Sequence, residues 1–269
     1  MSNADAVVYE PASAERAVGV LRLNRPDNRN SMTGELLDAF ALAVADARRD
    51  KLARAIVLTG SGSCFSAGAD LRSQIQRDGD ANGPARMPHE GSFAMYTAFL
   101  SLLDVEVPVV GALNGHAVGG GFGLALLCDI RVGNIEARYG ANFARLGLHS
   151  GLGISYTLPR IVGASNAAEL LYTGRLVQGA EALRMGILSR AVVAAEVVAT
   201  ALEIATEIAK SAPIAVRMMK ATMKQNLGWD VAQAAWNEAY AQSATIATRD
   251  FQEGMAALLG KREPVFEGR

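Results

Sequence analysis

The sequence predicts an α/β fold that ends in a helical region. Short apolar stretches alternate with helical patterns early in the chain, two glycine-rich segments follow predicted strands, and helical patterns dominate after Ser155. The 269 residues suffice for one large domain, or for a domain with a small appendage. Half of the residues are apolar and 20% are charged, as in a globular protein with a sizeable core.

The N-terminal elements predict a strand, a turn and a helix in that order. Ala17–Leu23 alternates in part and is rich in branched residues, which indicates a strand with Val7–Tyr9 as its candidate partner. Asn24–Asn30 has the composition of a turn. Thr33 is the expected N-cap of a helix that runs to about Arg49. The apolar residues of this helix recur at helical spacing at Leu36, Leu37, Phe40 and Val44.

The next stretch holds a short buried strand at Ala55–Thr59 and a Gly/Ser-rich loop at Gly60–Gly68 that ends near Asp70. Gln74–Pro88 is polar and contains glycines and prolines, so we expect a mobile excursion there. Ser92–Leu103 predicts a helix.

A second strand–loop–helix junction follows. Val107–Leu113 predicts a strand that is broken at Asn114–Gly115. Gly119–Gly121 opens a helix that continues through Leu127, and Ile130–Val132 predicts a further strand. Helices are then expected at Ala194–Ser211, Pro213–Asn226, Trp229–Tyr240 and Thr245–Leu259.

Composition excludes several classes of function. The net charge is −1 without a Lys/Arg run, which argues against nucleic-acid binding and against a polybasic membrane contact. No signal peptide or membrane-spanning run is present, so we expect a cytoplasmic protein. Cys64 and Cys128 sit in apolar company and are expected to be buried and free. The three histidines are far apart in sequence, so no metal site is predicted.

Two similar junctions, Cys64–Leu71 and Gly115–Leu124, place small residues where a strand ends and a helix begins. Such residues let a ligand approach the backbone, and a helix N-terminus offers unpaired N–H groups. Two converging donors would form an oxyanion hole for a carbonyl oxygen. The alternative is that the glycines only permit tight packing. A dinucleotide fingerprint does not fit, because Gly119–Gly123 reads GGGFG.

Over about residues 5–267, the chain resembles the crotonase (enoyl-CoA hydratase/isomerase) superfamily. The resemblance implies a ClpP/crotonase-type spiral of β–β–α units with a helical C-terminal trimerisation region. Residues 1–195 would form the core with the CoA site, and residues 196–269 would assemble a homotrimer or a dimer of trimers. The matching segments are Leu23–Thr33, Val57–Leu71, Pro108–Val132, Leu158–Gly163, Thr173–Leu188 and Asp250–Phe266.

The resemblance also implies a site. The backbone N–H groups of Ala69 and Gly120 would hold the oxygen of an acyl-CoA thioester and stabilise an enolate. Coenzyme A would enter as part of the substrate, and no prosthetic group is implied. The residues implied in CoA binding are Arg29, Ser31, Ala67, Asp70, Leu71 and Lys261. Lys261 or, alternatively, Arg262 would contact a CoA phosphate. The other possibility is that Lys261 and Arg262 are only a solvated pair on the surface.

The chain departs from the hydratases of this superfamily at their two catalytic glutamates. Gly123 and Phe143 stand at those positions, and Asn142 replaces the usual proline. A third acidic position, used by related isomerases and dehalogenases, falls near Gly151. Hydration needs a base to activate water and an acid to protonate carbon. Because neither Gly123 nor Phe143 can carry a proton, the standard acid/base pair is absent.

Two side chains are candidates to replace that pair. Tyr96 lies on the helix expected to line the acyl pocket, and the alternative is an aromatic side chain on a buried helix face. His149 lies just beyond the second missing glutamate, and the alternative is a loop histidine packed beside Ser150. Glu90, beside the polar excursion, is a weaker third candidate.

Three functions remain open from the sequence. The first is an enzyme of the enoyl-CoA hydratase/isomerase type with an altered acid/base set. The second is different chemistry on the same enolate, such as thioester hydrolysis, decarboxylation or carbon–carbon cleavage. The third is an acyl-CoA binding protein without catalysis.

Overall fold

The computed structural model describes residues 6–70, 88–228 and 230–268. Within these residues the larger sheet has the strand order β1-β2-β3-β5-β7-β10. Its β1 and β2 are antiparallel and the other neighbours are parallel. The strands are β1 (Val7–Glu10), β2 (Val18–Leu23), β3 (Ala55–Gly60), β5 (Val109–Leu113), β7 (Ile130–Asn134) and β10 (Arg190–Val192).

A smaller sheet has the order β4-β6-β8-β9. The chain passes from β3 to β4, from β5 to β6 and from β7 to β8, so each turn adds one strand to each sheet. This arrangement confirms the predicted spiral of β–β–α units. The short strands are β4 (Cys64–Ser66), β6 (His116–Val118), β8 (Arg138–Gly140) and β9 (Val177–Gln178).

Helices bury both faces of the larger sheet. In β3, Ile56 and Leu58 pack into the core that contains α1 (Gly34–Arg49). Ala55 and Val57 point to the other face and pack against α8 (Val197–Lys210). A strand buried on both faces has no polar alternation, which explains the continuous apolar run of its sequence.

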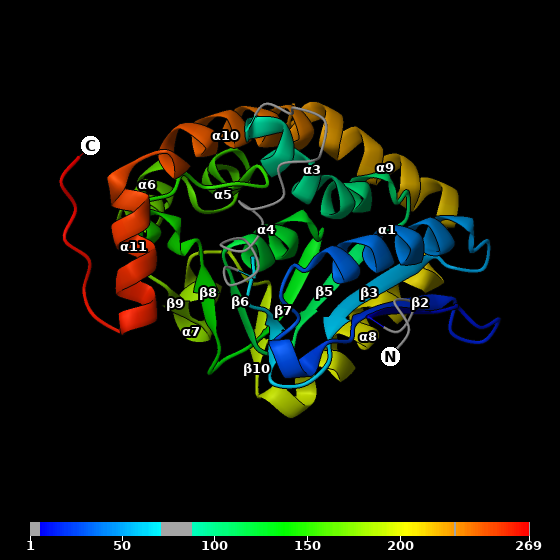
Figure 1. The fold of residues 1–269 in the computed structure, drawn as a ribbon. Coiled ribbons are helices and arrows are strands. Elements are labelled where there is room, and N and C mark those ends of the chain that lie inside the picture. The colour runs from blue at the N-terminus through cyan, green and yellow to red at the C-terminus, as the bar shows by residue number, and fades with distance from the viewer. Residues whose placement is uncertain (1–5, 71–87, 229, 269) are drawn as a thin grey trace.

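The remaining helices place the C-terminal region over the core. Figure 1 shows α10 passing across the top of the molecule beside α3, with α11 at one edge. The helices are α3 (Pro88–Leu100), α4 (Gly120–Leu127), α5 (Ile154–Val162), α6 (Ala164–Thr173), α7 (Gly179–Arg184), α9 (Pro213–Asn226), α10 (Val231–Ile246) and α11 (Arg249–Gly260).

The expected N-cap is confirmed, because Leu36 N donates to Thr33 Oγ1 at 3.2 Å. Several boundaries differ from the prediction: the helix expected to end at Tyr240 runs to Ile246, and the one expected from Thr245 starts at Arg249. The helix expected at Ser92–Leu103 begins at Pro88, ends at Leu100 and continues as a 3-10 turn, η3 (Ser101–Asp104). The helix expected from Trp229 starts at Val231, because Asp230 accepts from Gln233 N and caps it. The loop interpretation missed β4 and β6, whose three residues each are too short to show a pattern.

Of the expected excursion at Gln74–Pro88, all but the last residue lies outside the described residues. Cys64 and Cys128 are free and buried, as predicted.

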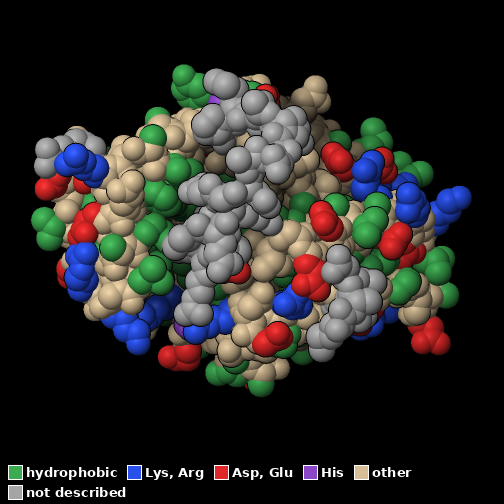
Figure 2. Space-filling model, in the orientation of Figure 1, with side chains coloured by type: hydrophobic (Ala, Val, Ile, Leu, Met, Phe, Trp, Pro, Cys, Tyr) green, Lys and Arg blue, Asp and Glu red, His purple; other side chains and the backbone are tan. Residues whose placement is uncertain are grey.

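Acidic and basic side chains are interspersed on the visible face (Figure 2), in keeping with the net charge of −1. No described helix combines the length and the apolar character needed to cross a bilayer. The described residues also contain no cluster of His, Cys, Asp or Glu suited to a metal ion.

Candidate functional site

A buried asparagine joins two loops beside the glycine-rich junctions. Asn30 is fully buried, and its Nδ2 donates to the carbonyl oxygens of Ser61 at 3.1 Å and Cys64 at 2.8 Å. Its Oδ1 accepts from Arg25 N at 2.8 Å. Because all these partners are backbone groups, Asn30 fixes the turn that carries Arg29 against β4. The sequence predicts a turn here and gives no sign of the contacts of Asn30.

The first junction presents a backbone donor at Ala69. The carbonyl of Gly68 accepts from Met32 N at 2.8 Å. In a trans peptide the C=O and the following N–H point in opposite directions, so Ala69 N–H points away from Met32. Gly68 has φ +81, and a methyl group added to it would lie 2.6 Å from Val118 O and 3.0 Å from Gly120 N. Only glycine permits this close approach without strain.

The second junction presents Gly120 N–H in the same way. The carbonyl of Gly119 accepts from Gly123 N at 3.0 Å, as the first bond of α4. The N–H of Gly120 belongs to the same peptide as that carbonyl and therefore points out of the N-terminus of α4. Gly119 has φ +56, which a glycine adopts readily.

Ala69 and Gly120 line one cavity, which we call the glycine recess. Its volume is about 560 Å³, including the open mouth. Among its described lining residues the polar side chains are Ser92, Tyr96, Asn142 and Gln242, and no carboxylate, histidine or lysine is present. The other described lining residues are Ala67, Met95, Gly119, Phe143, Leu146, Leu148 and Ile246.

Leu152 occupies the space that a side chain at position 123 would need. A methyl group added to Gly123 would lie 2.8 Å from Leu152 Cδ2 and 3.1 Å from its Cβ. Leu152 is fully buried and has φ +61, which is uncommon for a branched residue. Position 151 also has no room for a side chain, because a methyl group added to Gly151 would clash with the Tyr96 hydroxyl.

Phe143 fills the other expected acidic position. It is 8% exposed and lies in the 3-10 turn η4 (Asn142–Leu146). A methyl group added to Gly119 would lie 3.8 Å from Phe143 Cζ and 3.5 Å from Asn142 Oδ1. The aromatic edge and the carboxamide therefore stand beside the N-terminus of α4. The sequence shows Asn142 only as the residue that stands where a proline is usual, and no local pattern indicates that it lines the recess.

Tyr96 lines the glycine recess but is held by another side chain. Its hydroxyl donates to Gln242 Oε1 at 3.1 Å, while Gln242 Nε2 donates to His149 O at 3.0 Å. Burial raises the pKa of Tyr96 well above its usual value, with the carboxylate of Glu238 as a smaller cause in the same direction. Tyr96 therefore stays protonated near neutral pH, and Gln242 links α3 to α10 across the recess.

The side chain of His149 lines a different cavity from that of Tyr96. Its Nδ1 lies 2.8 Å from Ser150 O, and its backbone N donates to Thr245 Oγ1 at 3.1 Å. The two candidate acid/base side chains are thus not brought together. Glu90 is exposed and does not line the glycine recess either.

The residues implied in CoA binding divide into two groups. The Arg29 carbonyl accepts from Ala67 N at 3.0 Å, so the turn that holds Arg29 and Ser31 adjoins the first junction. Arg29 is exposed, and Asp70 is half-buried. Lys261 is exposed at the C-terminal cap of α11 and does not line the glycine recess. Leu71 lies outside the described residues, and Arg262 pairs with Glu253 at 2.5 Å.

A buried carboxylate holds the loop that carries Leu152. Glu238 on α10 is 3% exposed and accepts from Gly153 N at 2.5 Å and Ser155 N at 2.6 Å. It also accepts from Ile154 N and from the Ser150 hydroxyl, both at 3.2 Å. These amides begin α5, where the helix dipole stabilises negative charge. The sequence offered no signal for this contact, because α5 and α10 are far apart along the chain.

Comparisons with known proteins cover nearly the whole chain. The model of the enoyl-CoA hydratase/isomerase family matches residues 13–269. A crotonyl-CoA hydratase from Syntrophomonas wolfei is 34% identical over 253 residues, which are 94% of this chain and 95% of that protein. A short-chain-enoyl-CoA hydratase from Clostridium acetobutylicum is 32% identical over 93% of this chain and 94% of that protein. An enoyl-CoA hydratase/isomerase structure from Pseudoalteromonas atlantica has a TM-score of 0.84 at 29% identity, covering 97% of this chain and all of that one.

Proposed function

Because the chain belongs to the enoyl-CoA hydratase/isomerase family and has the crotonase fold, we propose that it is an enzyme acting on an acyl-CoA thioester. The thioester oxygen would lie between the N–H groups of Ala69 and Gly120. One observation carries the proposal: both peptides have their carbonyls occupied by protein donors, so that both N–H groups point away from those bonds beside one recess.

The described lining of the glycine recess restricts the chemistry. Ser92, Asn142 and the Tyr96–Gln242 pair provide hydrogen bonds but no charge. We therefore propose enolate chemistry of the hydratase/isomerase type in which water or the substrate, rather than a glutamate pair, moves the proton. Asn142, beside Gly119, is the described side chain best placed to orient that water.

The uncharged lining also favours a second candidate, the decarboxylation of a thioester with a carboxylate on its α-carbon. The bond to the carboxylate breaks, carbon dioxide leaves, and the electron pair moves into the enolate held by the two amides. Water then protonates the α-carbon, and the hydroxide that remains takes up carbon dioxide as bicarbonate. This reaction needs no base from the protein, which fits the described side chains of the glycine recess.

Assays with crotonyl-CoA, longer enoyl-CoAs and methylmalonyl-CoA separate these candidates. Loss of the conjugated double bond identifies hydration, and release of carbon dioxide identifies decarboxylation. Binding of all these thioesters without turnover of any would support an acyl-CoA binding protein without catalysis. Infrared difference spectra of crotonyl-CoA labelled with carbon-13 at the carbonyl test the oxyanion hole directly. An unshifted carbonyl stretch on binding would refute the proposed role of Ala69 and Gly120.

We propose that Arg29 and Ser31, with Ala67 and Asp70, contact CoA, because their turn adjoins the first junction. Leu71 is included from the sequence alone. Lys261 would contact a phosphate on a neighbouring subunit, since it lies outside the recess of its own chain. Arg29→Ala should weaken CoA binding measured by calorimetry, and Arg16→Ala on an exposed turn is the matched control.

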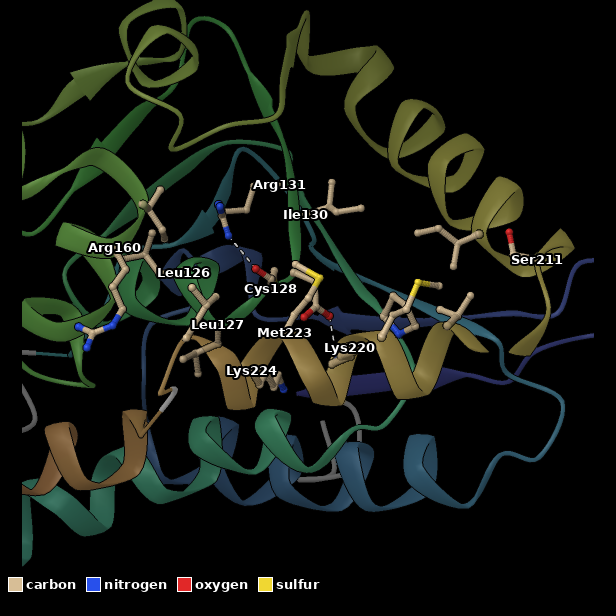
Figure 3. Close-up of a pocket in the computed structure, with 17 residues that line it drawn as sticks. Leu126, Leu127, Cys128, Ile130, Arg131, Arg160, Ser211, Lys220, Met223 and Lys224 are labelled. Atoms are coloured by element: carbon tan, nitrogen blue, oxygen red, sulfur yellow. Dashed lines mark hydrogen bonds and ion pairs between the residues drawn. The ribbon is translucent and has the colours of Figure 1, made fainter. Parts of the chain in front are cut away.

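We propose that residues 196–269 assemble the chain into a homotrimer or a dimer of trimers. The support lies in α9, which has no buried residue and exposes Met218, Met219 and Met223. Lysine side chains hold α9 beside a cavity that has a volume of about 1290 Å³ including its open mouth (Figure 3). Lys220 Nζ lies 2.8 Å from Asp129 Oδ2 and donates to Val107 O at 2.8 Å.

An amphipathic helix that exposes its apolar side chains needs a partner surface. Met219→Glu should therefore lower the assembly state in sedimentation velocity. Gln225→Glu, an exposed change on the same helix, serves as the control. A wild-type monomer would refute the proposal.

A further inference from the structure

A second cavity begins on the other side of Phe143. We call it the alanine recess, and its volume is about 1070 Å³ including its open mouth. Phe143 and Leu148 line both cavities, so these two side chains form the wall between them. The alanine recess lies between η4, α5 and α6, and most of its lining is apolar: Ala141, Ala144, Ala167, Ala168, Pro159 and Leu171.

The two cavities differ in what they can hold. The glycine recess contains the backbone donors and has about half the volume of its neighbour. A chain too long for the glycine recess would have to continue elsewhere. The alanine recess offers a mostly apolar lining that adjoins the glycine recess at Phe143 and Leu148.

We propose that the alanine recess is the subsite for the distal part of a long acyl chain, with Phe143 as the side chain that the chain passes. This inference rests on the proposed function. A carboxylate at position 143 would put a charge against that path, and desolvating a charge is unfavourable. The aromatic ring keeps the wall apolar. The substrate class is therefore a CoA thioester of a long, unbranched fatty acid.

Calorimetric titration with butanoyl-, octanoyl- and dodecanoyl-CoA tests this subsite. Each buried methylene strengthens binding about fourfold, so the affinity should rise by at least about tenfold from butanoyl- to dodecanoyl-CoA. Ala168→Phe fills the alanine recess and should remove most of that gain while leaving butanoyl-CoA binding unchanged. Ala144→Phe fills the same cavity from η4 and should act alike, even if one of the two variants folds poorly.

The matched control is Ser165→Phe, which adds the same ring to an exposed position of α6 outside the recess. It should keep the full chain-length dependence. The inference would be overturned if the affinity of the wild type did not rise with chain length, or if both recess variants kept the wild-type rise. Neither result would contradict the thioester site. If no acyl-CoA binds at all, the proposed function fails with it. Loss of assembly in Ala168→Phe, with the chain-length series intact, would assign the cavity to a second copy instead.

Discussion

The glycine recess has two halves, one formed by backbone groups and the other by side chains. Its backbone half, at Ala69 and Gly120, consists of peptides held by neighbouring backbone bonds and by glycines that allow close contact. In its side-chain half, Phe143 lines the recess, and Leu152 occupies the space next to Gly123. The backbone half depends on peptide hydrogen bonds and glycines, whereas the side-chain half depends on the identity of single side chains. Because Leu152 fills the space beside Gly123, a larger side chain at position 123 alone should be unfavourable.

The largest effect is expected from separating the two backbone donors. In Gly68→Ala the new methyl group would lie 2.6 Å from Val118 O and 3.0 Å from Gly120 N, at φ +81. The two junctions must then move apart, and losing one oxyanion donor lowers turnover by about 10²–10³, or about 3–4 kcal/mol. Turnover of the thioester identified by the substrate assays measures this loss.

Gly163→Ala is the matched control for the strain, because Gly163 has φ +80, is exposed between α5 and α6 outside the glycine recess, and has open space where the methyl group would lie. It should lower the free energy of unfolding by about 1 kcal/mol without changing turnover. Equal turnover losses in the two variants would contradict the special role of Gly68.

The next largest effect should follow from Glu238→Ala, which removes the carboxylate that holds the Leu152 loop. Four donors at the start of α5 and at Ser150 lose their acceptor. Because unsatisfied buried donors are unfavourable, the free energy of unfolding should fall by about 3 kcal/mol in urea titrations. Asn237→Ala, exposed on the same helix, should change it by less than about 0.5 kcal/mol. Similar losses in both variants would mean that α10 contributes through packing alone.

The fit between positions 123 and 152 is tested by placing a glutamate at position 123. Gly123→Glu should lower the free energy of unfolding by about 1–3 kcal/mol, because Leu152 occupies the space. Leu152→Ala should relieve this clash, so a double-mutant cycle should give a coupling energy above about 1 kcal/mol. In the control cycle, Leu148→Ala replaces Leu152→Ala and should give little coupling. Additive losses in both cycles would show that the two positions are independent.

The sequence was informative wherever local chemistry determines structure. The Thr33 cap, the strands Val18–Leu23 and Ala55–Gly60 and the start of α4 follow from residue pattern and turn composition. The strands of the smaller sheet are two or three residues long and were missed, because their pairing is decided by the spiral path.

The candidate site was predictable in its backbone half and in the placement of Tyr96 beside it, but not in the contacts that its side chains make. The glycine-rich junctions indicated where Ala69 and Gly120 would lie, and both line one recess. The side-chain half depends on contacts between distant segments. No local pattern indicates that Gln242 would engage Tyr96, or that His149 would face a separate cavity behind Phe143. The residues at positions 123 and 143 are visible in the sequence, but the close approach of Leu152 to Gly123 is not.

The smallest effect is expected at Tyr96, the candidate acid that the structure places in the recess. If Tyr96 only supports Gln242, Tyr96→Phe should change turnover by less than about threefold, whereas loss of a general acid lowers it by about 10²–10⁴. The free energy of unfolding should fall by about 1–2 kcal/mol near pH 8, because Gln242 loses a buried partner. Burial raises the pKa of Tyr96, so its stabilising effect is present below the unfolded pKa of about 10 and is lost as pH rises further. The stability difference between wild type and Tyr96→Phe should therefore narrow above about pH 10, and a constant difference in urea titrations at both pH values would contradict this account.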